Sequence, residues 1–270
     1  MKIELSVIIF AGIFGACMGS FLNVVAQRTI QGRKWWGAER SECDFCHKIL
    51  EWYELIPIVS FLIQFGKCRS CKNKIAPVHF LSEVICMTGT AIIFYTFKFN
   101  AWPIIFGVII FYASVLNALT DVLSGDIYDL FAYVPGVLGL VLRFAGGFDA
   151  FLDGVYGMAL GFGIFAVIIL ISRGGMGWGD ANFMAGAGGI LGVKLLCVSF
   201  YAGVMIGGTY AIILIILGRV KFGRHDAIPL VPFLALGIFT SLIFGEDILN
   251  YLGEKFFMFD IFKLDWPFRF

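Results

Sequence analysis

The stretch AWPIIFGVIIFYASVLNALTD, residues 101–121, decides the fold class, because a long run without charge ends at a single aspartate, Asp121. A helix of about 20 apolar residues crosses the roughly 30 Å hydrocarbon layer of a membrane. The chain is 60% hydrophobic and 14% charged, whereas soluble domains carry roughly 25% charged residues. We therefore expect an all-α polytopic membrane protein with about eight transmembrane helices, over residues 4–26, 78–97, 101–120, 127–146, 150–172, 181–193, 195–217 and 227–245.

The first and sixth of these spans need a comment. The first resembles a signal sequence in position, but Lys2 is offset by Glu4 and the apolar run continues past Cys17, so we expect a retained helix. The span at 181–193 is rich in glycine and only about 20 Å long as a helix. Whether it crosses the membrane fully or is re-entrant is left open at this stage.

The sizeable polar segment, residues 27–77, is rich in lysine and arginine. Basic loops stay on the cytoplasmic side of a membrane, so we expect this segment to be cytoplasmic. Counting spans onward then puts Asp121, the loop 174–180 and the loop 219–225 on the same side, with both termini outside. The net charge of +1 gives no indication of a nucleic-acid partner, and none is expected.

Four of the seven cysteines form two pairs with a two-residue gap, Cys43 with Cys46 and Cys68 with Cys71. Such spacing lets both sulfur atoms of a pair face one metal, and four thiolates make a closed structural zinc site. Disulfides are disfavoured in a reducing cytoplasm. We expect a small zinc lobe between the first two helices, with a disulfide or redox pair, or idle thiols, as the alternatives.

These features predict four parts of the chain. Residues 1–26 form the first transmembrane helix, and 27–77 form the cytoplasmic zinc-binding lobe. A membrane domain follows over 78–250, and an aromatic tail over 251–270 looks suited to the membrane interface.

Two aspartates stand out, because ionisable groups at membrane depth are costly and usually functional. Asp121 ends one apolar run, and Asp180 ends the glycine-rich sequence Gly177-Trp178-Gly179-Asp180 before the next. Two neighbouring carboxyl groups share one proton, which equips them to activate water and to protonate a carbonyl oxygen. We expect Asp121 and Asp180 to form such a pair and to hydrolyse an amide.

Several segments in this order resemble the bacterial type IV prepilin peptidases, membrane aspartic proteases of the GxGD type. They are 15–28 with its sequence GSFLNVV, the two cysteine pairs flanking WYELIPIVS at 52–60, Asp121 with Asp129, the 177–180 motif, and IPLVPFLA at 228–235. The chain departs from the family at Tyr128, where proline is usual, and at Asn182, where lysine is frequent. We interpret these differences as tuning of the site.

The resemblance implies cleavage of the leader from prepilins or pseudopilins at the cytoplasmic face of the bacterial inner membrane. It makes Asp121 and Asp180 catalytic, with Gly177, Gly179, Asp129 and Asn182 in the supporting loop. It also implies N-methylation of the new terminus with S-adenosylmethionine, an activity that the family links to the cysteine lobe. The sequence has no fingerprint for that cofactor, so its binding residues are unassigned, as is the oligomeric state; lipid is the other expected partner.

Two other classes of function fit part of the pattern. Glycine-broken helices with buried acids occur in ion transporters, but no inverted repeat is visible and a four-cysteine lobe has no evident role in transport. A membrane-bound zinc scaffold without chemistry would leave the 177–180 motif unexplained. Peptide cleavage that depends on the two aspartates would favour a protease, whereas ion flux that depends on them would favour a transporter. Function that is retained after both aspartates are neutralised would favour a scaffold.

Overall fold

The computed structural model describes residues 2–37, 40–172, 176–218 and 229–255. Within those ranges the regular structure is helical, apart from two isolated bridges in the cysteine lobe. Seven of the described helices are long and apolar enough to span a membrane, which confirms the predicted all-α polytopic class. The chain forms two compact units, Met1–Phe99 and Asn100–Phe270. The predicted loop 219–225, residues 173–175 and most of the aromatic tail lie outside the described residues.

The first unit is built on two helices, α1 (Lys2–Ile30) and α3 (Pro77–Thr96), which pack along each other. Their contact uses glycine: a Cβ on Gly19 would lie 2.7 Å from the carbonyl oxygen of Ser82. Between them the chain forms the cysteine lobe, with the short helices η1 (Trp52–Leu55) and α2 (Val59–Ile63). The lobe follows the cytoplasmic end predicted for α1, where Arg28 lies in the last turn.

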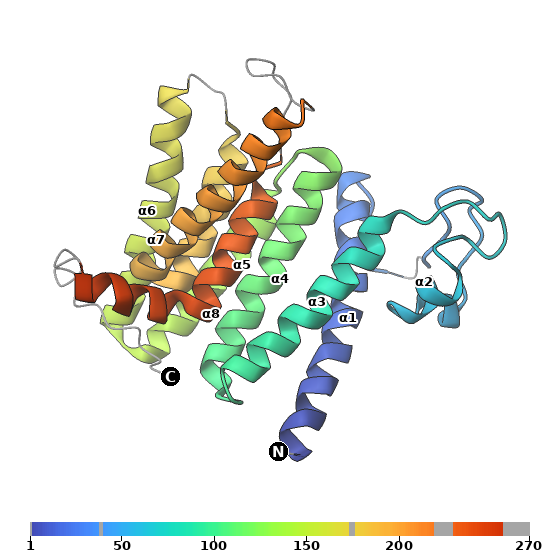
Figure 1. Ribbon diagram of the computed structural model, residues 1–270, viewed down its shortest axis with the longest axis horizontal. Coiled ribbons are helices and arrows are strands. Elements are labelled where there is room, and N and C mark those ends of the chain that lie inside the picture. The colour runs from blue at the N-terminus through green and yellow to red at the C-terminus, as the bar shows by residue number, and fades with distance from the viewer. Residues whose placement is uncertain (1, 38–39, 173–175, 219–228, 256–270) are drawn as a thin grey trace. The chain divides into compact units, whose positions relative to one another are not determined.

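The second unit holds the remaining helices (Figure 1). α7 (Trp178–Ile216) packs against α5 (Asp129–Arg143), α6 (Phe148–Ile171) and α8 (Val231–Lys255), while α4 (Ala101–Ser124) packs mainly on α8 and α5. Lipid tails are as apolar as the helix surfaces, so close packing through small residues replaces the hydrophobic driving force. A Cβ on Gly136 would lie 2.6 Å from the Cα of Gly186, so α5 and α7 approach to backbone contact there.

A break divides α7 into two arms. Gly192 has φ +75° and ψ −179°, which is not helical and is a backbone conformation that glycine adopts without strain. The first arm runs beside α5 in the same direction, because Gly186 contacts Ala132 and Ile190 contacts Gly139 further along both helices. At 14 residues (178–191) this arm is about 21 Å long.

The second arm returns to the starting end of the first. Leu195 contacts Gly245 in the second half of α8, whereas Gly203 contacts Leu234 near its start. The start of α8 is tied to Asp121, at the end of α4, by the Val231 N–H. The predicted spans 181–193 and 195–217 therefore correspond to the two arms of α7. Because α7 is broken at Gly192, the seven described helices that could span a membrane contain eight helical segments.

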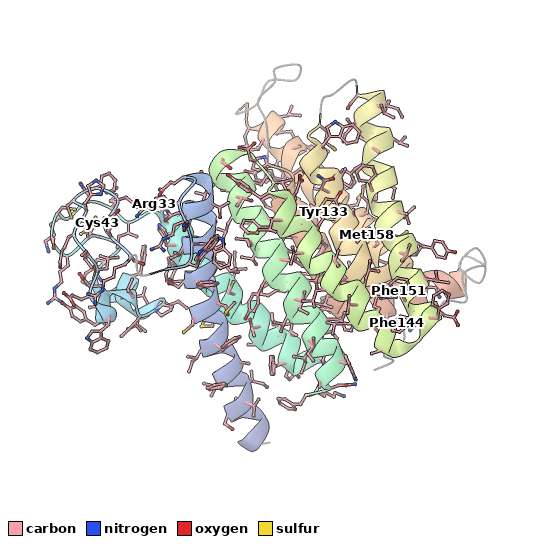
Figure 2. The ribbon with its side chains drawn as sticks, turned by 180° about the vertical axis from the view of Figure 1, so that it is seen from behind. Arg33, Cys43, Tyr133, Phe144, Phe151 and Met158 are labelled. Carbon is pink, nitrogen blue, oxygen red and sulfur yellow. The ribbon has the colours of Figure 1, made fainter. Side chains whose placement is uncertain are left out.

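A buried polar cluster holds the reversal. The guanidinium of Arg143, at the end of α5, is completely buried and pairs with Asp153 of α6. Arg143 also donates to the carbonyl oxygens of Ala150 (Nε, 2.8 Å) and Ile190 (Nη1, 3.1 Å). The other Asp153 oxygen accepts the Val193 N–H at 3.2 Å. The cluster thus joins α5, α6 and both arms of α7, near the turn where Phe144 meets Phe151 edge to face (Figure 2).

Replacing the buried carboxylate by Asp153→Asn should destabilise the second unit strongly. Removing one partner of a buried ion pair costs about 3–5 kcal/mol, and the α7 reversal loses its charged anchor. Thermal unfolding in detergent measures the loss. Asp149→Asn on the exposed first turn of the same helix is the matched control, and equal stability of the two variants would contradict this role.

Candidate active site and metal centre

The first predicted acid, Asp121, lies in the last turns of α4 and is 9% exposed. Its Oδ2 accepts the backbone N–H of Val231 at 3.0 Å, which connects α4 to the first residue of α8. The helix ends one turn later at Gly125, whose left-handed conformation (φ 73°) lets its N–H bond the Asp121 carbonyl oxygen at 2.8 Å. The contact with Val231 was not predicted, although the segment 228–235 is one of those that resemble the prepilin peptidases.

The second predicted acid, Asp180, lies in the first turn of α7 and is half-buried. Gly177 caps this turn, and its carbonyl oxygen accepts the Asp180 N–H at 3.3 Å. A Cβ on Gly179, the residue before Asp180, would lie 2.7 Å from the Cβ of Ile127, which closely follows the end of α4 that carries Asp121. The fold therefore brings the two acids, far apart in sequence, to one end of the second unit.

The two glycines of the motif have different roles. A Cβ on Gly179 would lie 2.7 Å from the Cβ of Ile127, so this position needs the close approach that glycine allows. A Cβ on Gly177 would meet nothing nearer than the Asp180 carboxylate, at 3.8 Å. The structure thus gives a packing reason for Gly179 and no steric reason for Gly177.

The supporting residues Asp129 and Asn182 are joined directly. Asn182 Nδ2 donates to Asp129 Oδ1 at 2.6 Å, and Asn182 Oδ1 accepts the Tyr133 hydroxyl at 2.7 Å (Tyr133, Figure 2). These bonds tie the first turn of α7 to the first two turns of α5. Tyr133 was not predicted, yet it is four residues after Asp129 and so lies on the same helix face. Asn117 was also missed; its amide donates to the Phe131 carbonyl oxygen at 3.0 Å and joins α4 to α5.

The four predicted cysteines come together in the first unit. Their sulfur atoms lie within 4.8 Å of one another, and Cys43 Sγ is 3.8 Å from Cys71 Sγ. A tetrahedral zinc ion with bonds of about 2.3 Å would separate its sulfur ligands by about 3.8 Å. The set Cys43, Cys46, Cys68 and Cys71 therefore fits one metal ion, and these cysteines form no disulfide.

The two halves of this cluster share one backbone pattern. Cys43 N–H bonds the Lys48 carbonyl oxygen (3.0 Å), and Cys68 N–H bonds the Asn73 carbonyl oxygen (2.8 Å). Each cysteine carbonyl in turn accepts an N–H from the residue just after the second cysteine of its pair, His47 or Lys72. The repeated turn presents both sulfur atoms of a pair on one side.

Local hydrogen bonds prepare one thiol for metal binding. The backbone N–H groups of Cys71 and Ser70 lower the pKa of the Cys68 thiol to about 7. Thiolates, rather than thiols, ligate metals. Cys68 is therefore available as a ligand near neutral pH.

Comparison with known proteins places this fold and site in a family. The model of the Bacterial Peptidase A24 N-terminal domain matches residues 13–97, and that of the Type IV leader peptidase family matches residues 104–212. The two matches fall within the first and second unit respectively. The chain belongs to the type IV leader peptidase family.

Three similar proteins share one description, prepilin leader peptidase/N-methyltransferase. The one from Bacillus subtilis (strain 168) is 32% identical over 88% of this chain and 95% of its own length. The one from Stutzerimonas stutzeri is 25% identical over 90% and 93%. The one from Myxococcus xanthus (strain DK1622) is 32% identical over 68% of this chain and 56% of its own. No solved structure matches the chain significantly.

The Asn182 bridge makes a prediction about stability. Asn182→Leu removes a donor to Asp129 and an acceptor for Tyr133, so the free energy of unfolding should fall by about 1–2 kcal/mol, the sum of two ordinary hydrogen bonds. Thermal unfolding in detergent tests this. Tyr133→Phe loses only one of the two bonds and should cost about half as much; an unchanged Asn182→Leu protein would show that the bridge carries no stability.

Proposed function

We propose that this protein is an intramembrane aspartic endopeptidase that removes the leader peptide from type IV prepilins or pseudopilins. The observation that carries the proposal is the placement of Asp121 and Asp180 at one end of the second unit, where Gly179 packs against Ile127 and the Val231 N–H bonds Asp121. The family and the names of the similar proteins supply the substrate class. The same names support a second activity, N-methylation of the new amino terminus with S-adenosylmethionine.

The two carboxyl groups supply what amide hydrolysis needs. With one proton between them, the carboxylate accepts a proton from a water molecule, whose oxygen attacks the scissile carbonyl carbon. The protonated partner gives its proton toward the carbonyl oxygen, which becomes a hydroxyl of the tetrahedral intermediate. Collapse of the intermediate breaks the C–N bond, and the leaving nitrogen takes a proton from the pair.

The surroundings of each acid suit this chemistry. The Val231 N–H fixes one oxygen of Asp121, so the carboxyl group keeps one orientation. Asp180 lies in the first turn of α7, where the helix dipole favours negative charge. The Asn182 bridge holds that turn against α5.

We place the protein in the bacterial cytoplasmic membrane as a multi-pass protein, with the aspartates on the cytoplasmic side. The basic segment 27–77 supports this orientation. Large apolar side chains lie exposed on the spanning helices, including Phe10, Val141, Leu170 and Ile216, which suits contact with lipid.

The cysteine cluster is best explained as a structural zinc site. All four donors are protein thiols, so no position is left for water or substrate. The lobe has little regular structure, and bound metal would supply much of its folding free energy.

The central test compares prepilin cleavage by wild type and Asp180→Asn. The variant keeps the shape of the side chain but cannot share the proton, so the cleavage rate should fall by about a thousandfold or more. Gel or mass analysis of a prepilin-type substrate in liposomes measures the rate. Asp126→Asn, exposed just beyond α4, should cleave like wild type, and full activity in Asp180→Asn would refute the proposal.

Metal analysis tests the zinc site separately. Purified protein should contain about one zinc ion, and Cys43→Ser should lose most of it because a closed site needs all four thiolates. Cys17→Ser, outside the cluster, should keep its zinc. Metal-free wild type with freely reactive thiols would contradict a structural site.

A further inference from the structure

The cysteine lobe has an apolar edge formed by η1, α2 and the residues beside them. The side chains of Trp52, Ile63 and Phe65 are 75%, 71% and 88% exposed. The edge continues through further exposed apolar side chains, those of Tyr53, Ile56, Val59 and Leu62. Protein surfaces in water rarely expose so many neighbouring apolar side chains unless a partner covers them, so the edge is expected to have one.

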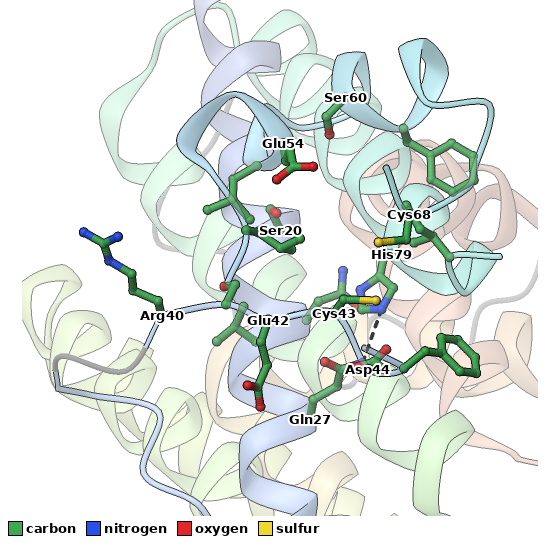
Figure 3. A pocket seen from close by; sticks show the side chains of 18 of the residues that line it. Ser20, Gln27, Arg40, Glu42, Cys43, Asp44, Glu54, Ser60, Cys68 and His79 are labelled. Carbon is green, nitrogen blue, oxygen red and sulfur yellow. Dashed lines mark hydrogen bonds between the residues drawn. The ribbon is translucent and has the colours of Figure 1, made fainter. Parts of the chain in front are cut away.

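The two faces of α2 differ in their surroundings. The inner face lines a cavity inside the first unit, through Ser60, Phe61 and Gln64. Figure 3 shows Ser60 beside this cavity, together with Glu54 of η1. The outer face carries exposed apolar side chains at helical spacing, Val59, Leu62 and Ile63. Side chains three and four residues apart share one side of a helix, so the apolar edge points away from the interior of the lobe.

Two contacts fix the level of α2 along α3. The Ile58 N–H, at the start of α2, donates to Glu83 Oε2 at 2.7 Å. Phe61 stacks on Phe80 with ring centroids 4.8 Å apart. Phe80 and Glu83 are three and six residues after Pro77, the first residue of α3, which is about 5 and 9 Å along the helix. Since α3 has 20 residues and needs nearly all of them to cross the membrane, α2 lies beside its first two turns at the membrane boundary.

This level is that of the membrane interface. Amphipathic segments that lie in the interface bury their apolar side about 5–10 Å into the boundary between headgroups and acyl chains. Tryptophan and tyrosine are enriched at the same boundary. Trp52 and Tyr53 begin the apolar edge and pack edge to face, with ring centroids 5.8 Å apart.

The exposed charges of this part of the lobe are positive. Over residues 52–74 the one acidic residue is Glu54, whose buried carboxylate lies 3.5 Å from Lys48. The same segment has four exposed basic residues, Lys67, Arg69, Lys72 and Lys74. None of the four is in an ion pair with another described residue. The Arg69 guanidinium lies 5.5 Å from the ring centroid of Tyr53, so positive charge adjoins the apolar edge.

We propose that the η1–α2 segment anchors the cysteine lobe in the membrane interface, with the apolar edge against acyl chains and the four cations on anionic phospholipid headgroups. Basic residues beside a bilayer attract such headgroups. The inference goes beyond the proposed peptidase and uses only the membrane placement of α1 and α3. Lipid fits the edge better than a protein partner, because the edge lies at interfacial depth beside a spanning helix and is bordered by positive charge.

Photo-cross-linking to lipid tests the anchor. The photoreactive amino acid p-benzoylphenylalanine is placed at Ile63 of the full-length protein, in vesicles of about three parts phosphatidylcholine to one part phosphatidylglycerol. Mass analysis after irradiation should find adducts of the protein with one phospholipid. The same probe at Gln64, the next residue but on the inner face of α2, is the matched control and should give clearly fewer lipid adducts.

A probe at Phe65 provides a second position on the apolar edge. Lipid adducts at neither Ile63 nor Phe65, in proteins that unfold thermally like wild type, would overturn the anchor. Adducts formed instead with a second copy of the chain, or with an added prepilin, would also overturn it and would identify the edge as a protein-binding surface.

The role of the cations is tested by removing three of them. Among the adducts at Ile63, phosphatidylglycerol should exceed its share of the vesicle lipid by about twofold or more. The triple variant Lys67→Gln, Lys72→Gln and Lys74→Gln should lose this enrichment and still form lipid adducts, because the apolar edge is unchanged. Lys98→Gln, which removes an exposed cation beyond the end of α3, should keep it. No enrichment in wild type, or equal enrichment in the triple variant, would refute the contact with anionic headgroups.

Prepilin cleavage by the same preparations separates this inference from the proposed function. Cleavage without lipid adducts refutes the anchor and leaves the peptidase standing. Lipid adducts without cleavage support the anchor and count against the peptidase.

Discussion

Backbone-to-backbone contact between glycine-containing helices is the constraint on which the second unit depends. Gly188 of α7 packs against the carbonyl of Gly157 on α6, and Gly186 packs against the carbonyl of Ala132 on α5. Side chains at these positions would push the first arm of α7 away from both neighbours. Because Asp180 opens that arm, its approach to Asp121 depends on these contacts as much as on the local motif.

The polar cluster at the other end of the arm completes the arrangement. Arg143 and Asp153 pair with each other and bond the backbone on both sides of the break at Gly192, through the Ile190 carbonyl oxygen and the Val193 N–H. The first arm is therefore held at this end as well as at its start. The second arm then packs along α8, whose first N–H binds Asp121. One continuous set of contacts therefore leads from the buried ion pair to Asp121 and Asp180, the two acids for which we propose a catalytic role.

Much of this could be predicted from the sequence. Charge-free runs gave the helices, and even the short span at 181–193 corresponds to a separate arm. The two aspartates and the four cysteines were identifiable because carboxylates at membrane depth and paired thiols have few structural uses. What escaped prediction were partners distant in sequence: Val231 on Asp121, Tyr133 on Asn182, and the pairing of Arg143 with Asp153. Their residue types are ordinary, and only the helix packing brings them together.

We propose that Asp121 and Asp180 act as one catalytic unit. The most direct measurement is the residual cleavage rate of Asp121→Asn, Asp180→Asn and the double variant under identical conditions. Residues that work as a unit are strongly non-additive, so the double variant should be no slower than the slower single variant. Losses that multiply in the double variant, or one single variant with nearly full activity, would contradict a shared-proton pair.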